Sequence, residues 1–250
     1  MRLPKRLEHG QEVALVGHLE ELRSRLFVAG GAVTATTILA FSVHARVIAL
    51  LVAQLPAEHR HLLTLGVAEP FTTSLKLSIA LGFALALPIV LWQLWSFLAP
   101  ALTPKTQHGI AGFTIFAAAL MAAGTAFGYR VALPAALHFL TNYDNSVYNV
   151  QIRAADFISF SVLVLAACGA VFELPIVVLG LVRVGALTSA KLRRNRRIGY
   201  MVVAVIGVAL PGVDPITTVM ETIPLAVLFE ASIWLSVLFE KRWNEVAQPA

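Results

Sequence analysis

Six apolar stretches, separated by charged residues and by turns that contain proline and glycine, run through this sequence. They cover approximately residues 26–43, 73–98, 109–131, 157–182, 198–210 and 216–239. A helix needs about 20 apolar residues to cross the hydrocarbon core of a membrane, where it must satisfy its own backbone hydrogen bonds. The pattern predicts an all-α polytopic membrane protein with six transmembrane helices, organised as a single domain over residues 1–250.

The composition supports the membrane class. Of the 250 residues, 58% are hydrophobic and 13% are charged, with a mean hydropathy of +0.79. A soluble domain carries about a quarter charged residues. The net charge of +5 favours membrane topology over nucleic-acid binding, because the positive residues lie in short loops and tails. Fourteen Lys and Arg residues fall on one side of the spans and four on the other, which predicts that both termini are cytoplasmic.

The fifth and sixth stretches are predicted to be short spans. The 13 residues of 198–210 rise about 20 Å as a helix, against about 30 Å of hydrocarbon. Such a span thins the bilayer, is flanked by snorkelling side chains or packs in a depression. The sixth stretch is interrupted by Glu221, Pro224 and Glu230.

The two long outer loops, about residues 43–69 and 133–156, contain apolar stretches at 47–55 and 135–140 beside turn-forming residues. These stretches are too short to cross a membrane. They are predicted to form helices that lie over the outer face.

Glu173 lies deep within the fourth apolar stretch, and Pro175 follows two residues later. A carboxylate at such depth costs at least a few kcal/mol, so it usually faces a cavity or a partner. Pro175 is predicted to kink the helix, because proline has no backbone donor. Two interpretations stay open: a protonated side chain bonded to a neighbouring helix, or a functional acid.

Residues 1–25 are predicted to form a polar cytoplasmic segment that leads into the first span. Leucines recur at helical spacing within residues 18–26, which predicts an amphipathic helix. Glu21 and Arg25 are four residues apart and are expected to pair along one face. The segment is either a solvated anchor at the membrane surface or an acidic site that receives a basic peptide.

The second span carries features at both ends. Glu69 and Pro70 are typical of a helix start, so we interpret Glu69 first as a cap. Trp92 and Trp95 near the inner end are typical of an aromatic belt at the membrane surface. Phe97 and the loop that follows it are an alternative lining for a peptide groove.

Two further spacings concern helix packing. Glu221 and Glu230 are nine residues apart and therefore fall on opposite faces of a helix, so one is expected to face inward. Gly124 and Gly128 form a G-x-x-x-G pair that favours close helix contact. The single Cys168 excludes an internal disulfide and is predicted to be a small core residue.

No sequence motif indicates catalysis. The chain lacks H-E-x-x-H, G-x-S-x-G and Walker patterns, and its seven His residues do not fall at ligand spacing. An enzyme is therefore not expected, and neither is a bound metal or cofactor.

Several motifs, in order along nearly the whole chain, resemble the TatC family, the six-span core subunit of the twin-arginine protein translocase. They are H-L-x-E-L-R-x-R-L at 18–26, E-P-F at 69–71 with K-L at 76–77, W-x-F-x-A-P-A-L at 95–102, F-E-x-P-I-V at 172–177 and I-P-L-A-V-L-F-E at 223–230. The resemblance implies a cytoplasmic-side receptor for Arg-Arg signal peptides on folded cargo and a scaffold for the pore, driven by the proton-motive force. It also implies a multi-pass protein of the cytoplasmic (inner) membrane, with TatA- and TatB-type single-span partners and homo-oligomers within the receptor complex.

The resemblance assigns roles to particular residues. The residues expected to bind the signal peptide are Glu21, Glu20, Arg23, Phe97 and the position of Thr106. Those expected within the membrane, for docking of partners, are Glu173, Pro175, Thr218, Glu221 and Glu230. Asp214 matches an acid in the outer turn before the last span.

The chain also departs from the family pattern. Thr106 stands where the family usually has a second recognition Glu, Thr218 stands where it has a Gln, and Gln54 stands where it has a Pro in the first outer loop. One acid in place of two weakens charge-assisted bonding to two guanidinium groups. Either Glu20 compensates, or the chain is a divergent paralogue with altered cargo recognition.

Two functions from other classes remain as alternatives. A proton-coupled transporter of small solutes would use Glu173 and Glu221 as proton carriers. A purely structural scaffold would tolerate loss of Glu21. The motif series favours the translocase subunit over both.

Overall fold

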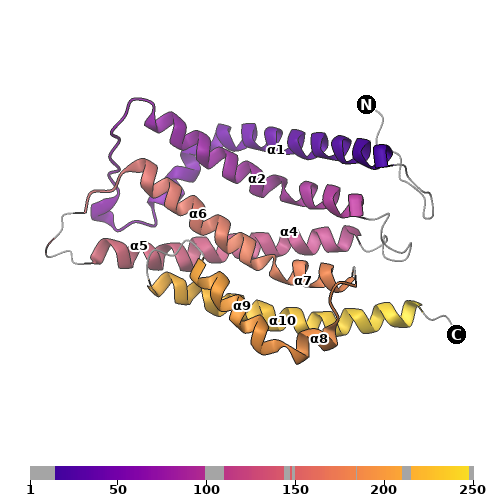
Figure 1. Ribbon diagram of the computed structural model, residues 1–250. Coiled ribbons are helices and arrows are strands. Elements are labelled where there is room, and N and C mark those ends of the chain that lie inside the picture. The colour runs from indigo at the N-terminus through magenta and orange to yellow at the C-terminus, as the bar shows by residue number, and fades with distance from the viewer. Residues whose placement is uncertain are drawn as a thin grey trace. The chain divides into compact units, whose positions relative to one another are not determined.

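The computed structural model describes residues 15–98, 110–143, 147, 150–183, 185–209 and 215–247, and these residues are almost entirely helical (Figure 1). The elements are α1 (Leu15–Val52), the 3-10 turn η1 (Ala57–His59), α2 (Glu69–Leu98), α4 (Ile110–Phe127), the π turn η3 (Gly128–Ala132), α5 (Leu133–Asn142), α6 (Ala154–Phe172), α7 (Leu174–Arg183), α8 (Ser189–Arg194), α9 (Arg196–Ala209) and α10 (Pro215–Ala247). The only β pairing in the described residues is an isolated bridge between Leu63 and Arg153.

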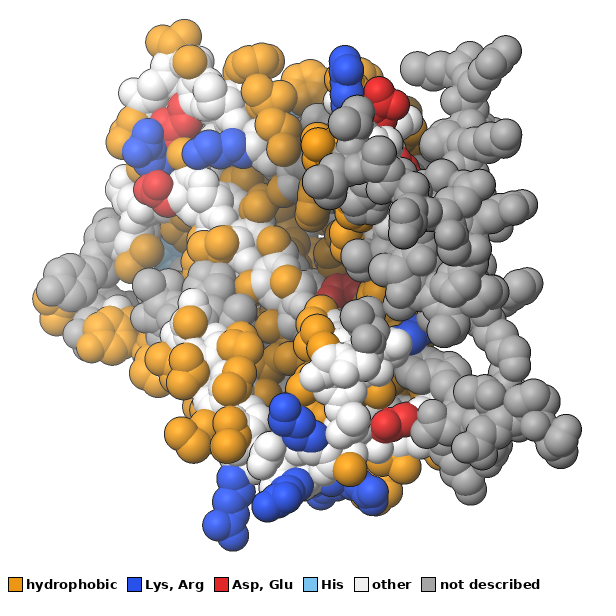
Figure 2. Space-filling model, turned by 45° about the vertical axis from the view of Figure 1, so that its right-hand side comes forward, with side chains coloured by type: hydrophobic (Ala, Val, Ile, Leu, Met, Phe, Trp, Pro, Cys, Tyr) orange, Lys and Arg blue, Asp and Glu red, His pale blue; other side chains and the backbone are white. Residues whose placement is uncertain are grey.

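Five helical stretches of the described chain are long and apolar enough to cross a membrane. They are Leu19–Val52, Glu69–Phe97, Gly112–Asn142, Ala154–Arg183 and Thr218–Glu240. Large hydrophobic side chains are exposed along them, and Figure 2 shows such side chains over much of the face that it draws. The predicted all-α polytopic class is confirmed.

The two predicted short spans have different outcomes. Helix α9 has 14 residues and a length of about 21 Å, so the fifth span stays a prediction. The last helix is not short. Glu221, Pro224 and Glu230 lie inside the 33 residues of α10 without ending it. Glu221 is buried, Glu230 pairs with Arg196 of α9, and a proline removes only one helical hydrogen bond.

The outer apolar stretches continue the helices that precede them instead of forming separate ones. Helix α1 runs on to Val52, because Pro56 is the first residue that breaks the pattern. Helices α4 and α5 are joined by the π turn η3, which ends two residues before Pro134. A π turn widens the helix and so accommodates the ring and the missing donor of a proline.

The chain divides into two compact units, one within Met1–Ala45 and Ser74–Ala119 and the other within Arg46–Thr73 and Leu120–Ala250. In the first unit, α1 and α2 approach closely. The hydroxyl of Thr36 donates to the carbonyl oxygen of Gly82 at 2.7 Å, and a Cβ at Gly82 would collide with Thr37. Trp95 of α2 and Phe113 of α4 pack edge to face, with ring centroids 5.1 Å apart.

The core of the second unit joins α6, α9 and α10. Its buried side chains are Val171, Val203, Leu225, Phe229 and Ile233. Glycines bring α9 against α10, because a Cβ at Gly199 would meet the Phe229 ring and one at Gly207 would meet Thr222. The eight-residue spacing places these glycines about 80° apart around α9, and both face α10.

The G-x-x-x-G pair packs as predicted. A Cβ at Gly124 would lie 2.6 Å from the carbonyl oxygen of Cys168 and 2.7 Å from the Cβ of Phe172. A Cβ at Gly128 would lie 3.0 Å from the Cβ of Cys168. The missing side chains thus allow this part of α4 and η3 to touch the backbone of α6.

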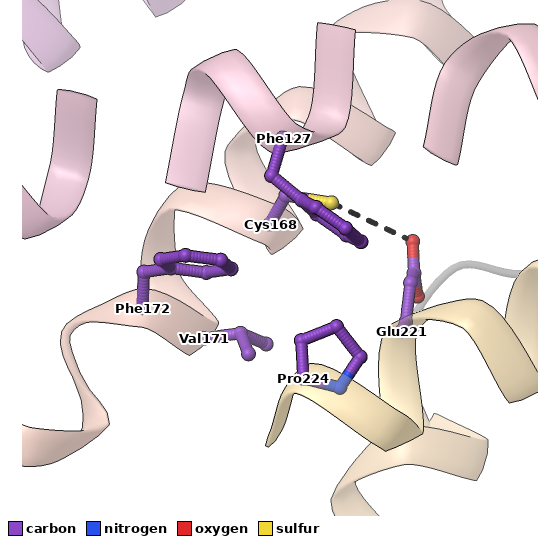
Figure 3. Close-up of a pocket in the computed structure, with 6 residues that line it drawn as sticks. All are labelled: Phe127, Cys168, Val171, Phe172, Glu221 and Pro224. Atoms are coloured by element: carbon purple, nitrogen blue, oxygen red, sulfur yellow. Dashed lines mark hydrogen bonds between the residues drawn. The ribbon is translucent and has the colours of Figure 1, made fainter. Parts of the chain in front are cut away.

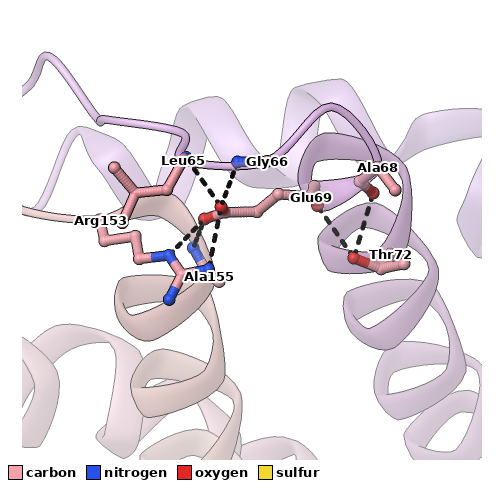
Figure 4. A network of polar contacts seen from close by, with 7 residues as sticks. All are labelled: Leu65, Gly66, Ala68, Glu69, Thr72, Arg153 and Ala155. Atoms are coloured by element: carbon pink, nitrogen blue, oxygen red, sulfur yellow. Dashed lines mark hydrogen bonds and ion pairs between the residues drawn. The ribbon is translucent and has the colours of Figure 1, made fainter.

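Glu69 begins α2, as predicted, and its carboxylate also holds the outer segments together (Figure 4). It accepts backbone N–H bonds from Leu65 at 2.9 Å, Gly66 at 3.3 Å and Ala155 at 3.2 Å. Arg153 donates to it through Nε at 2.9 Å and Nη2 at 3.1 Å. The hydrogen bond from Arg153 to Glu69 raises the pKa of the Arg153 guanidinium, because it stabilises the charged form.

Candidate functional site

Glu21 lies near the start of α1 and pairs with Arg25, as the four-residue spacing predicts. Nε of Arg25 donates to Oε1 of Glu21 at 3.0 Å, and Nη2 bonds the same oxygen. The Glu21 and Arg25 side chains are only 8% and 9% exposed. The other carboxylate oxygen of Glu21, Oε2, is buried and has no hydrogen-bond partner among the residues that the structure describes.

Arg25 also connects this acid to the end of α2. Its Nη1 donates to the carbonyl oxygen of Gln93 at 3.2 Å. Phe97, half-buried, lies one helical turn beyond Gln93. The structure therefore brings Glu21 and the end of α2 that carries Phe97 into one region of the first unit.

Glu20 and Arg23 are exposed neighbours of Glu21. The guanidinium of Arg23 lies over the ring of Phe27, 5.7 Å from its centroid, at a distance typical of a cation–π contact. These two side chains thus flank the buried acid at the surface of α1.

The helix breaks at Glu173, between α6 and α7, as Pro175 predicts. The N–H of Glu173 donates to the carbonyl oxygen of Ala170 at 3.1 Å, three residues back instead of four. The N–H of Val177 then donates to the carbonyl oxygen of Glu173 at 3.1 Å, four residues back, and restarts the helical pattern. The break places the Glu173 side chain at a change of helix direction, within the second unit.

Both carboxylate oxygens of Glu173 are buried and have no hydrogen-bond partner in the described part of the chain. A bond to a neighbouring helix, one of the two interpretations from the sequence, is therefore not seen there. A buried polar group without a partner is destabilising unless water or another molecule supplies one. Glu173 is thus an acceptor that the described protein leaves unused.

A small pocket lies beside the helix break in the second unit (Figure 3). The residues that line it are Phe127, Cys168, Val171, Phe172, Glu221 and Pro224. Within it the thiol of Cys168 is 3.9 Å from Oε1 of Glu221, and both side chains are 3% exposed. The inward orientation predicted for one of the two α10 acids is that of Glu221, and Cys168 is the buried core residue expected from the sequence.

Glu230, on the opposite face of α10, binds α9. Its carboxylate pairs with Nη1 of Arg196 at 3.0 Å and accepts the Tyr200 hydroxyl at 2.9 Å and the Trp234 indole N–H at 3.2 Å. The Arg196 guanidinium also lies 5.8 Å from the centre of the Trp234 ring. Glu230 is thus engaged within the chain, whereas the sequence assigned it to partner docking.

The remaining predicted residues lie elsewhere. The carbonyl of Thr218, on α10, accepts the Thr222 hydroxyl at 2.7 Å. Pro175 is buried at the start of α7. Thr106 and Asp214 lie outside the described residues.

Sequence reasoning missed three partners: Gln93 for Arg25, Cys168 for Glu221, and Arg196 for Glu230. Each contact joins residues from different helices, whereas residue spacing predicts partners only within one helix. Of the three, only Arg196 is a cation near a predicted helix end, so only Arg196 carries a sequence signal for its contact.

The carboxylates of Glu21 and Glu173 are suited to binding hydrogen-bond donors. Glu21 and Glu173 each present buried acceptor oxygens to a donor, and charge-assisted bonds of that kind are about twice as strong as neutral ones. No three His, Cys, Asp or Glu side chains in the described ranges could together hold a metal ion. Glu21 in the first unit and Glu173 in the second are interpreted as two separate groups that bind donors.

Comparisons with known proteins agree with this architecture. The sequence model of the family described as "Sec-independent protein translocase protein (TatC)" matches residues 17–224. The TatC protein of Carboxydothermus hydrogenoformans is 33% identical over 225 residues, which cover 90% of this chain and 93% of that protein. The TatCd protein of Bacillus subtilis is 35% identical over 237 residues, which cover 94% and 96%.

A solved structure shows the same fold. The crystal structure described as twin arginine translocase receptor TatC in DDM superposes with a TM-score of 0.76 at 31% identity, covering 88% of this chain and 99% of that one. Family, relatives and fold agree across most of the chain. The chain belongs to the TatC family, and it is a multi-pass membrane subunit of the Sec-independent, twin-arginine protein translocase and not an enzyme.

Proposed function

We propose that this TatC subunit is the cytoplasmic-side receptor for twin-arginine signal peptides, with Glu21 as the first contact for a signal arginine. The proposal rests on Oε2 of Glu21, which is buried and has no hydrogen-bond partner among the described residues. A carboxylate can accept at both oxygens, and a guanidinium offers five N–H donors in a planar fork. A signal arginine would donate hydrogen bonds to Oε2, the carboxylate oxygen of Glu21 that Arg25 does not bind.

Arg25 and Gln93 prepare the acid for this role. Arg25 is held at one end by Glu21 and at the other by the Gln93 carbonyl, so the carboxylate is fixed in direction before a peptide arrives. Fixing a binding group in advance reduces the entropy lost on association. Phe97, one turn from Gln93, is then placed to contact the apolar part of a signal peptide.

In this proposal Glu21 is the one recognition acid, because Thr106 stands where the family usually has a second Glu. Glu20 is exposed next to Glu21 and is the nearest substitute along the chain. Successive residues on a helix point about 100° apart, so Glu20 and Glu21 would contact different parts of a peptide. The proposed recognition is thus narrower than that of a receptor with two buried acids.

Glu173 supports a second part of the proposal, the docking of a partner helix in the cytoplasmic membrane. Its buried oxygens would accept hydrogen bonds from a polar side chain of a single-span TatA- or TatB-type subunit. The helix break at Glu173 opens the backbone where such a helix would pass. Homo-oligomers of this chain would bring several such sites together, and the proton-motive force would drive transport.

Helix α9 would assist passage of the cargo. At about 21 Å it is shorter than the hydrocarbon core, so it would thin the bilayer beside it. Lengthening it by about five leucines, roughly 7.5 Å, should reduce export. Unchanged export would refute this step.

The main experiment compares binding of a fluorescent Arg-Arg signal peptide to the full chain in detergent. Glu21→Gln should weaken binding by roughly tenfold or more, because the charge-assisted bond is lost while the size of the side chain is kept. Glu20→Gln is the matched control, since it removes the same charge one residue away, and it should change binding less. Binding unchanged in Glu21→Gln, or reduced equally by both variants, would overturn the assignment of Glu21.

A further inference from the structure

A cluster of exposed cations lies where α8 meets α9. Its members, here called the basic corner, are Lys191, Arg193, Arg194 and Arg197. No described acidic side chain forms an ion pair with any of the four. Figure 2 shows Lys and Arg side chains gathered along the lower edge of its face, at the height where Figure 1 places α8.

The basic corner is built on a docked helix and not on a loose loop. The Ser189 N–H donates to the Glu240 carboxylate at 2.8 Å, and the Thr188 hydroxyl caps α8 by accepting the Lys191 N–H at 3.2 Å. Leu192 packs against the core of the second unit. Since Leu192 faces inward, the cations on either side of it turn outward, and the docked helix fixes the backbone that carries them.

The start of α9 is held as well. Arg196 is the cation of this segment that does pair, and its partner is Glu230. This pair, together with the Gly199–Phe229 contact, fixes α9 against α10. Arg197, the next residue, is exposed and completes the basic corner.

An apolar surface begins immediately after the basic corner. Side chains along one stripe of α9 are largely exposed: Ile198, Met201, Val202, Val205 and Val208. Such a stripe is the surface expected to face lipid tails in a membrane protein. The cations at its end therefore lie at the level where tails give way to headgroups.

The chemistry at that level is set by phosphate. Guanidinium groups bind phosphate oxygens in bidentate geometry, and each cation near an anionic membrane surface strengthens binding. As a short span, α9 would also draw headgroups inward and so bring them to the cations. The positive-inside rule accounts for cations on this side of the membrane, but it does not require them to be held in place on a capped and docked helix.

We propose that the basic corner is a binding site for the headgroups of anionic phospholipids of the cytoplasmic leaflet, which hold the short α9 in the membrane. The site is independent of signal-peptide binding, because it involves none of the residues around Glu21. A lipid is the occupant that fits, because the exposed cations of the basic corner continue into the exposed apolar stripe of α9.

The test uses the full chain, purified from nanodiscs made with equal amounts of phosphatidylglycerol and phosphatidylcholine. Native mass spectrometry then counts the lipids of each kind that the protein retains. The intact chain should retain phosphatidylglycerol preferentially. The variant with Arg193→Gln, Arg194→Gln and Arg197→Gln should lose that preference by roughly fivefold for each cation removed.

Two matched variants decide the cause. Replacing the same three arginines by lysine should keep most of the preference, because the charges remain. Replacing three exposed cations elsewhere, Arg46→Gln, Lys76→Gln and Arg130→Gln, should leave the preference intact. Equal loss in this control, or unchanged preference in the basic-corner variant, would overturn the proposal.

Free phosphate distinguishes a lipid from a small anion. Inorganic phosphate added at constant ionic strength should not displace phosphatidylglycerol, because the tail contacts with α9 remain. Displacement would overturn the lipid assignment. The Gln variant keeps Arg183, Lys191 and Arg196 on the same side, so its orientation stays as the positive-inside rule predicts.

Discussion

Arg153 and Glu69, 84 residues apart, form a two-bond ion pair that joins the segment before α6 to the start of α2 (Figure 4). The Leu63 N–H beside it donates to the Ile152 carbonyl at 2.9 Å, and the Ala154 N–H donates to the Leu63 carbonyl at 2.8 Å. One carboxylate thus supports a short piece of β-like pairing between the segment around Leu63 and the segment before α6. The helices of a membrane protein form largely by local hydrogen bonding, whereas such outer segments depend on contacts of this kind.

Glu69→Gln should loosen this pairing. A glutamine side chain has one acceptor oxygen and no charge, so it cannot accept both Arg153 hydrogen bonds as the carboxylate does. The segments around Leu63 and Ala154 should therefore open more often. Hydrogen–deuterium exchange of peptides containing these two amides should speed up, while exchange in the core helices stays the same. Glu58→Gln is the control, because Glu58 is exposed in the same outer region. Equal acceleration in both variants would contradict the role given to Glu69.

Gly124→Ala should destabilise the contact between α4 and α6. Its Cβ would lie 2.6 Å from the backbone oxygen of Cys168, and backbone cannot move aside as a flexible side chain can. Overpacking of this kind costs about 1–3 kcal/mol. Gly112→Ala in the same helix is the control, since nothing lies within 4 Å of its Cβ, and it should be neutral or slightly stabilising. Thermal unfolding in detergent compares the two, and a loss in both variants would argue against a packing cause.

The pair between Arg196 and Glu230 should contribute a measurable coupling. Removing either charge frees the end of α9 from α10, but both side chains are partly exposed, so the coupling should be only about 0.5–1 kcal/mol. A double-mutant cycle with Arg196→Gln and Glu230→Gln, followed by thermal unfolding, measures it. A coupling of zero would show that Tyr200 and Trp234 hold Glu230 without help from Arg196.

The helices were predictable because lipid requires backbone hydrogen bonds to be local, and apolar runs therefore report helices directly. The ends of the helices were less predictable than the helices themselves. Helix α1 passes Val43, where the apolar run ends, since no breaking residue occurs before Pro56. The π turn before Pro134 also escaped prediction, because a proline inside an apolar pattern predicts an interruption and not how the helix adapts to it.

The candidate site divides in the same way. The Glu21–Arg25 pair and the opposite faces of Glu221 and Glu230 follow from helical geometry and were predicted. The contacts of Arg25 with Gln93 and of Cys168 with Glu221 span 68 and 53 residues, and tertiary packing alone decides them. Sequence thus singled out the acids as candidates, and structure shows which of them have partners among the described residues.

Glu173→Leu should separate stability from function. Both oxygens of this carboxylate are buried without a partner among the described residues, so replacing it with an apolar side chain of similar size should stabilise the isolated chain by about 1 kcal/mol or more. In the proposed role the same oxygens bind a partner helix. Export of a folded Arg-Arg reporter and crosslinking to single-span subunits should therefore both fall, although the isolated chain is more stable.

Glu173→Gln is the matched variant for this prediction, because it keeps hydrogen-bonding capacity without the charge. It should retain more crosslinking than Glu173→Leu. Thermal unfolding of each purified variant is measured beside export and crosslinking in cells. A leucine variant that is less stable and still exports the reporter would show that Glu173 supports the fold and does not dock a partner, since only a group bonded within the chain loses stability in this way.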